Sequence, residues 1–261
     1  MDILCSRNNY IRNEAEKMLR SRKWFQTSTK EIQNKILTIP EIFNGFLNDL
    51  ADRQENFDDF ETLRMVDFNY NDHFAHSVFE VKSNFTGITG QKVYTAWKKG
   101  SYHSMRGILL LETNGRISHF LVRNCQRYAV GEEISESIGS IHPPMDLIMG
   151  GKIPTMYLEQ ELKNMTRLPK VEINRYFDLG KIYPDPSMSD NIVSLFAVTT
   201  KINNIEEISK HFENKKYDDK GYSFSFEVIQ IEKLLDFLSK TNDAFLLSIF
   251  GRLQALNVIN L

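Results

Sequence analysis

Apolar residues recur at helical spacing near the start of the chain. Ile32, Ile36 and Leu37 form a first group, and a second stripe begins after Pro40. That stripe comprises Ile42, Phe43, Phe46, Leu47 and Leu50. Spacings of one, three and four residues place such side chains on one face of a helix. The pattern predicts a helical N-terminal extension, to which we assign residues 1–66.

From residue 67 onward the pattern becomes typical of β-structure. Residues 91–97 alternate polar and apolar, as a half-buried strand does. Two apolar runs, 107–112 and 117–122, flank Asn114-Gly115, which is a strong short-range signal for a β-hairpin. The other expected elements are a helix over 155–165, strands over 175–179 and 192–198, and a short helix over 205–211.

The last part of the chain has an apolar stripe that runs from Ile229 to Leu253, which predicts helical structure over residues 226–256. The order of elements is therefore helices, a β-rich centre with one embedded helix, and helices again. This order indicates the α+β class. We expect a central domain over residues 67–204 and a helical C-terminal segment over residues 205–261.

Composition argues against several classes of function. The chain has 32 basic and 34 acidic residues and a net charge of −2, which argues against a broad nucleic-acid-binding surface. No apolar run approaches the ~20 residues of a membrane span, and the first residues lack the order of a secretory signal. Cys5 and Cys125 cannot form a disulfide framework or a four-thiolate zinc site. We expect a soluble, cytoplasmic protein that binds neither nucleic acid nor membranes.

Motifs in the second half of the chain follow a familiar order. The stretch QELKNMTRL at 160–168 comes first, followed by RYFDLGKIYP at 175–184 and SDNIVSLF at 189–196. This order resembles the Nudix helix and the strands that follow it in nucleotide-diphosphate-sugar pyrophosphatases. The resemblance implies a Nudix-like mixed β-sheet sandwich over residues 67–204, with helical extensions at both ends.

The catalytic signature of Nudix hydrolases is not preserved in this chain. When the last position of the signature is aligned with Leu168, Glu161 and Leu162 match, but Asn164 and Met165 replace the metal-binding glutamate pair. Mg²⁺ needs hard anionic oxygens to bridge a pyrophosphate and activate water. An amide and a thioether supply no such charge. We therefore predict Nudix architecture without Nudix hydrolysis, and expect Glu161 to be an exposed helix residue.

A second set of motifs covers more of the chain. It consists of HSVFEV at 76–81, Trp97, GILLLETNG at 107–115, FLV at 120–122, GGKIPTMYLE at 150–159 and IQIEKLL at 229–235. Their order resembles the NDP-hexose 2,3-dehydratases, whose subunits are built of Nudix-like halves. Subunits of that family usually contain two copies of the module. The single module of this chain implies a homodimer, which recreates the two-module arrangement.

The second resemblance implies a nucleotide-sugar lyase that eliminates water across C2–C3 of an NDP-4-keto-6-deoxyhexose in deoxysugar biosynthesis. The reaction needs a base, an acid and a donor to the enolate oxygen, but no cofactor. Tyr157 and Glu159 are the candidate acid and base because they lie in the best-matched motif. His142 and His76 are further acid/base candidates. A purely structural role would also account for the presence of each of these four residues.

Recognition of the nucleotide-diphosphate sugar is expected from a few residues. Arg123 and Arg127 follow the hairpin and could pair with the diphosphate. Lys152 follows Gly150-Gly151, a turn that allows the backbone to approach a phosphate closely. Trp97 could stack on the base, although a half-buried strand tryptophan is also an adequate explanation. We expect no metal site, because His73 and His76 have no third ligand nearby.

Two other functions remain open at this point. The lost carboxylates and the helical flanks also suit a non-catalytic Nudix-like module that binds a nucleotide or a protein. A Nudix pyrophosphatase with a displaced metal site would have to use the acidic group that precedes the expected Nudix helix. That group consists of Glu132, Glu133 and Glu136.

Overall fold

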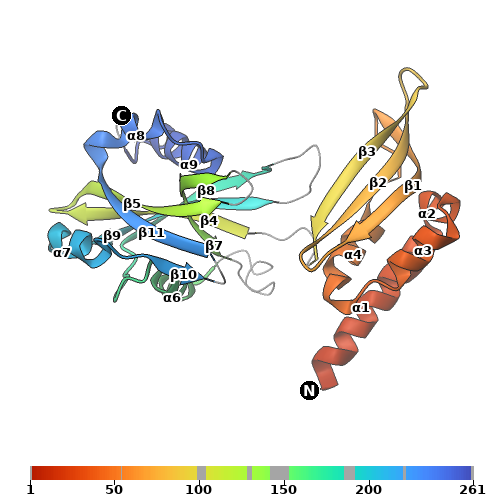
Figure 1. The fold of residues 1–261 in the computed structure, drawn as a ribbon, viewed down its shortest axis with the longest axis horizontal. Coiled ribbons are helices and arrows are strands. Elements are labelled where there is room, and N and C mark those ends of the chain that lie inside the picture. The colour runs from red at the N-terminus through yellow and green to blue at the C-terminus, as the bar shows by residue number, and fades with distance from the viewer. Residues whose placement is uncertain are drawn as a thin grey trace. The chain divides into compact units, whose positions relative to one another are not determined.

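A computed structural model describes residues 2–53, 55–98, 104–127, 131–141, 153–184, 192–219 and 222–259. The chain divides into two compact units (Figure 1). Unit 1 comprises residues 1–102 together with 183–192, and unit 2 comprises residues 103–182 and 193–261. Each unit is described by itself below.

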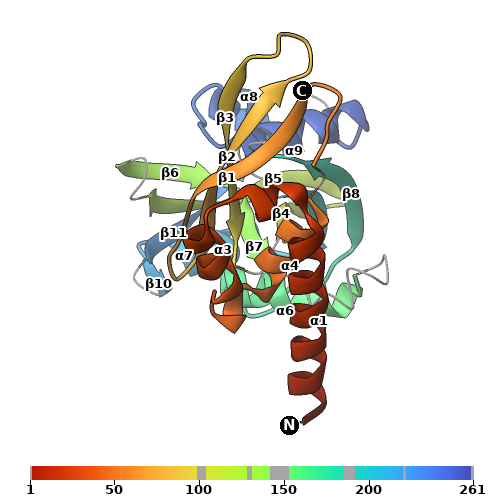
Figure 2. The ribbon, with the colours of Figure 1, turned by 90° about the vertical axis from the view of Figure 1, so that its right-hand side faces the viewer.

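Unit 1 consists of helices followed by an antiparallel sheet. The helices are α1 (Asp2–Ser21), α2 (Lys23–Thr27), α3 (Lys30–Leu37), the 3₁₀ turn η1 (Glu41–Phe43) and α4 (Asn44–Asp52). The strands are β1 (Phe60–Tyr70), β2 (Phe74–Ser83) and β3 (Thr89–Trp97), which pair in the order β1-β2-β3. The N-terminal half of α1 extends beyond the other helices of this unit (Figure 2).

The core of unit 1 lies between its helices and one face of its sheet. Trp24 is fully buried, and its ring meets the Phe79 ring edge-on with centroids 5.2 Å apart. Phe46 from α4 stacks on Phe68 of β1 and on Tyr94 of β3. Because strand side chains alternate, this packing leaves the other face of the sheet without a helical cover from the described residues.

Unit 2 is built on a mixed sheet with the strand order β10-β11-β5-β4-β9-β8. The strands are β4 (Ser104–Thr113), β5 (Arg116–Arg127), β6 (Glu132–Glu136), β7 (Ile138–Ile141), β8 (Arg175–Ile182), β9 (Val193–Lys201), β10 (Tyr217–Asp219) and β11 (Tyr222–Gln230). Strands β4 and β9 run parallel, whereas the other pairs are antiparallel. Strands β6 and β7 lie off the main path and pair with β5 and β4.

Helices cover both faces of the unit 2 sheet (Figure 1). One face packs on α6 (Thr155–Thr166) and α7 (Ile205–Phe212), with Leu158 and Leu162 buried against Leu109 and Phe196. The other face packs on η2 (Ile231–Lys233), α8 (Leu234–Leu238) and α9 (Ala244–Ala255). We call these the α6 face and the α9 face. A sheet that is buried on both sides explains why β4 and β9 are almost continuously apolar.

The hairpin predicted at Asn114-Gly115 is confirmed. Strands β4 and β5 meet at these two residues, whose φ angles are +52° and +76°. A two-residue turn with both φ angles positive matches the twist of the flanking strands, and Asn-Gly is the pair best suited to it. The local sequence was therefore sufficient to predict this part of the sheet.

The α+β class is confirmed, as is the predicted helix now seen as α6. The helix expected over 226–256 is wrong at its start, because Phe226–Gln230 belong to β11. Tyr222, Phe224 and Phe226 alternate with Ser223 and Ser225, a period of two that favours a strand.

The observed units also differ from the predicted boundaries. The limit between residues 66 and 67 lies inside β1, and residues 205–261 belong to unit 2. The C-terminal residues contribute an outer strand and the cover of the α9 face. They are an integral part of the unit 2 core.

Candidate functional site

Arg123 and Arg127 of β5 converge on one carboxylate, that of Glu136 on β6. We call these three residues the Glu136 cluster. The Arg123 Nε donates to Oε1 of Glu136 at 2.6 Å, and the Arg127 Nη2 donates to the same oxygen at 2.7 Å. The hairpin register places Glu136 directly opposite Arg123, and the Arg127 side chain reaches the same carboxylate. Both arginines were predicted from the sequence as anion-binding residues, whereas their shared partner was not predicted.

Burial strengthens the ion pairs between Glu136 and the two arginines. The Glu136 side chain is 4% exposed, and those of Arg123 and Arg127 are 16% and 30% exposed. Ion pairs shielded from water interact more strongly than surface pairs. The hydrogen bonds thus join two guanidinium groups to one carboxylate on the α6 face.

A third arginine and a second carboxylate lie near the cluster. Arg106 of β4 donates to the carbonyl of Gly139, and its guanidinium lies 5.2 Å from the centre of the Phe245 ring. Burial lowers the pKa of Arg106, and the charge of Glu136 opposes this effect. Asp243 is 7% exposed and accepts hydrogen bonds from the backbone N–H groups of Phe245, Leu246 and Ser137. Asp243 thereby both caps α9 and connects it to the end of β6.

Tyr157 and Glu159 lie on α6 and have different surroundings. Tyr157 is half-buried and packs against the core of the α6 face. The Oε1 of Glu159 accepts a hydrogen bond from the backbone N–H of Ile173 at 2.9 Å. This bond connects the helix to the segment before β8, which is a structural role for Glu159. Their assignment as acid and base stays a prediction.

The positions aligned with the Nudix signature also lie on α6. Glu161 is half-buried, so the expectation that it is exposed was wrong: the helix turns this position partly toward the sheet. Asn164 is exposed and accepts a hydrogen bond from Gln160 at 2.9 Å, and Met165 packs against the core. Within the described ranges, no group of three or more His, Cys, Asp or Glu side chains could hold a metal ion.

His76 and Trp97 lie in unit 1, on the face of its sheet that its helices leave uncovered. The Nδ1 of His76 is 3.0 Å from Oγ1 of Thr95. Trp97 is 49% exposed and meets Phe74 edge-on, with ring centroids 6.4 Å apart. The structure therefore brings these two predicted site residues onto one surface. Their participation in catalysis or base stacking stays a prediction.

Four of the predicted site residues lie outside the described residues. They are His142, Gly150, Gly151 and Lys152. The predicted phosphate-binding turn and the predicted loop histidine therefore stay predictions.

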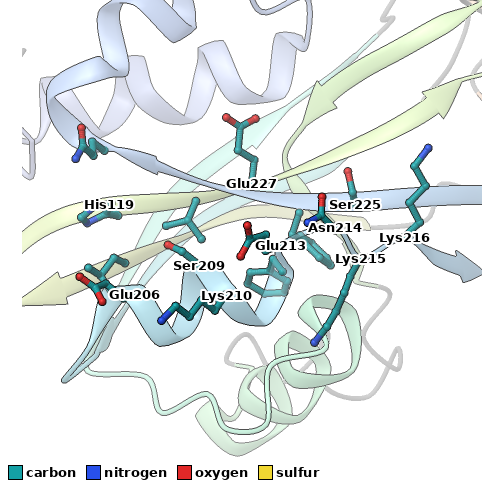
Figure 3. A pocket seen from close by; sticks show the side chains of 15 residues that line it. His119, Glu206, Ser209, Lys210, Glu213, Asn214, Lys215, Lys216, Ser225 and Glu227 are labelled. Carbon is teal, nitrogen blue, oxygen red and sulfur yellow. The ribbon is translucent and has the colours of Figure 1, made fainter.

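A hollow of about 840 Å³ adjoins α7 and the outer strand β11 (Figure 3). Its apolar part includes Phe226 and Val228, and its rim carries charged residues of α7 and the following turn. His119 lies at one end, where burial lowers its pKa and the charge of Glu232 opposes this effect. The sequence did not predict this hollow, because residues 226–230 of β11 were expected to be helical. The alternation of residues 222–228 was the available signal.

Comparison with known proteins supports the fold. No family model and no curated protein matches the sequence. The structure is similar to the crystal structure of an ADP compounds hydrolase, with a TM-score of 0.51 and 10% sequence identity. The match covers 79% of this chain and 100% of that chain. At this identity, the similarity concerns the fold alone. The chain is thus an α+β protein with a Nudix-like fold.

The extent of the match is informative about unit 1. Unit 2 begins at residue 103 and therefore spans less than two thirds of the chain, whereas the match covers 79%. The similarity must consequently extend into the residues before unit 2.

None of the described helices is long and apolar enough to cross a membrane.

Proposed function

We propose that this protein binds a nucleoside-diphosphate sugar and does not hydrolyse it. In this proposal Arg123 and Arg127 bind the diphosphate. The observation that carries the proposal is that two guanidinium groups share the single buried carboxylate of Glu136. Planar guanidinium groups match phosphate oxygens in geometry and form charge-assisted hydrogen bonds with them.

The chemistry of α6 supports binding without Nudix hydrolysis. Asn164 and Met165 occupy the positions where a Nudix hydrolase has its pair of metal-binding glutamates. Neither side chain carries the negative charge that a Mg²⁺ ion bound to a pyrophosphate requires. Glu161 remains as a single carboxylate of the signature and cannot replace a set of ligands.

The second candidate function is the elimination of water from the same class of ligand. The order of the dehydratase-like motifs favours it. Two of those motifs lie in the β4–β5 hairpin, and residues 155–159 of a third lie in α6, elements that suit a Nudix-like module. Tyr157 and Glu159 would supply the acid and the base of this reaction. A homodimer would supply the second module that the resembled family contains in one chain.

Binding can be tested with dTDP-glucose, UDP-glucose and ADP-ribose as probes, by thermal shift and calorimetry with and without Mg²⁺. A ligand that binds the folded state raises the apparent stability. We expect Arg123→Gln and Arg127→Gln each to weaken binding about tenfold, the effect of one charge-assisted hydrogen bond. Arg64→Gln is the matched control, because Arg64 pairs with Glu80 on unit 1. Failure of every probe to bind, or release of nucleoside monophosphate with Mg²⁺, would contradict the proposal.

Elimination is tested separately with dTDP-4-keto-6-deoxyglucose and mass spectrometry, by looking for the loss of one water. Tyr157→Phe and Glu159→Gln should abolish turnover while the ligand still binds. Glutamine at position 159 retains an oxygen that can accept the bond from Ile173, so the fold should persist. Binding without turnover in the unmodified protein would exclude the lyase and leave the binding proposal intact.

A further inference from the structure

The outer edge of β11 is open along part of its length. Strand β10 pairs only with Tyr222–Phe224, so Ser225–Gln230 have no strand partner on their outer side among the described residues. An unpaired edge exposes backbone N–H and C=O groups that can pair with another chain, and proteins usually blunt or cover it. The described part of this edge contains no proline and is six residues long.

The hollow beside this edge is lined by apolar residues at its centre and by residues of opposite charge at its two ends. Phe226 and Val228 point into it from β11, and Phe212 faces them from α7. Glu206 lies at one end of the hollow, whereas Lys215 and Lys216 lie at the other (Figure 3). None of these three side chains forms an ion pair with a described residue. The edge therefore has an acidic end and a basic end, with Lys210 and Glu213 between them.

We propose that a second copy of this chain pairs its β11 edge with this one, in antiparallel orientation about a two-fold axis. An axis perpendicular to the sheet reverses the strand direction, so the acidic end of one copy meets the basic end of the other. The same rotation keeps the α6 faces of both copies on one side of the joined sheet. The charged ends of the two hollows therefore meet on that side, and the interface is self-complementary in charge. Parallel pairing would bring like-charged ends together.

The alternation of side chains further restricts the register. Residues directly opposite each other in an antiparallel pair lie on the same face of the sheet, whereas neighbouring residues of one strand lie on opposite faces. One residue must therefore lie opposite its own copy at the two-fold axis. An axis at Glu227 would place two carboxylates opposite each other. An axis at Val228 pairs Val228 with its copy and Phe226 with Gln230. The geometry therefore points to Val228 as the residue on the axis.

The first test is the mass of the full-length protein, measured by sedimentation velocity over a range of concentrations. We expect a reversible dimer. Lys215→Glu/Lys216→Glu makes both ends acidic and should raise the dissociation constant about tenfold or more, because like charges then face each other twice. Glu206→Lys makes both ends basic and should also weaken the dimer. An equimolar mixture of the two variants should restore association, since opposite ends meet again.

The matched control is Lys163→Glu/Lys201→Glu, which reverses two exposed charges of unit 2 that do not line this hollow. This double variant should dimerise as the unmodified protein does. A second measurement needs no variant: hydrogen exchange at Ser225–Gln230 should slow as the concentration rises through the dissociation constant. A protein that stays monomeric, or a dimer in which these amides gain no protection, would overturn the proposal. So would a mixture that fails to restore association.

Discussion

Glu136 illustrates how one side chain can determine the chemistry of a site. Its carboxylate is almost fully buried and accepts hydrogen bonds from both Arg123 and Arg127. Removing the carboxylate would leave two positively charged guanidinium groups close together. Each is partly shielded from water, so water would screen their repulsion only weakly. A buried ion pair that loses one partner is destabilised far more than an exposed pair.

We therefore expect Glu136→Ala to lower the free energy of unfolding by about 3 kcal/mol, as is typical when a buried pair is broken. The matched control is Glu172→Ala, which removes the exposed carboxylate that pairs with Lys170. That control should change the free energy of unfolding by less than about 1 kcal/mol. Urea denaturation measures both. Equal effects of the two substitutions would contradict the shielding inferred for the Glu136 cluster.

At the scale of elements, the ring of Phe196 on β9 lies against Gly107, its partner residue on β4. A Cβ atom at Gly107 would lie 2.4 Å from Cζ of Phe196. The Phe196 ring cannot move aside easily, because it is fully buried and stacks on Tyr176 with centroids 6.2 Å apart. This contact excludes any side chain at Gly107.

Gly107→Ala should therefore destabilise the protein by about 1–3 kcal/mol through overpacking. Adding Phe196→Leu should recover part of this loss, because the smaller side chain leaves room for the methyl group. Gly90→Ala in β3 is the control, since a Cβ atom there meets nothing within 4 Å. Thermal denaturation of the three variants checks the ranking. A neutral Gly107→Ala would show that the Phe196 ring can move aside at little cost.

At the scale of the whole molecule, each unit has a core of its own. The core of unit 1 includes Trp24, Phe46 and Phe79, whereas the two cores of unit 2 lie on either side of its sheet. Both tryptophans of the chain, Trp24 and Trp97, lie in unit 1. Tryptophan fluorescence thus reports on unit 1 alone, which allows the two units to be followed separately.

We expect Phe46→Ala to lower the stability of unit 1 by about 3–5 kcal/mol, since it removes a fully buried ring. The fluorescence transition in denaturant should shift accordingly. Hydrogen exchange in β4 and β9 should not change, because separate cores favour independent unfolding. A parallel shift of both signals would show instead that the two units unfold together.

Predictions from the sequence succeeded where the determining interactions are local. The Asn114-Gly115 hairpin depends on backbone conformations of two adjacent residues, and α6 depends on spacing within a dozen residues. The prediction failed for Phe226–Gln230, because their apolar side chains fit a helical stripe as well as a strand. Pairing with the distant β5 decides between the two. Such pairing cannot be read from the segment itself.

The candidate site follows the same division. The sequence alone identified Arg123 and Arg127 as anion-binding candidates, and it excluded a Nudix metal site at Asn164 and Met165, because ligand chemistry belongs to individual residues. Only the tertiary structure decided that both arginines share Glu136, since strand register places Glu136 opposite Arg123 and the Arg127 side chain reaches the same carboxylate. It alone also decided that β11 presents an open edge beside a charged hollow, because an edge exists only once the other strands have paired.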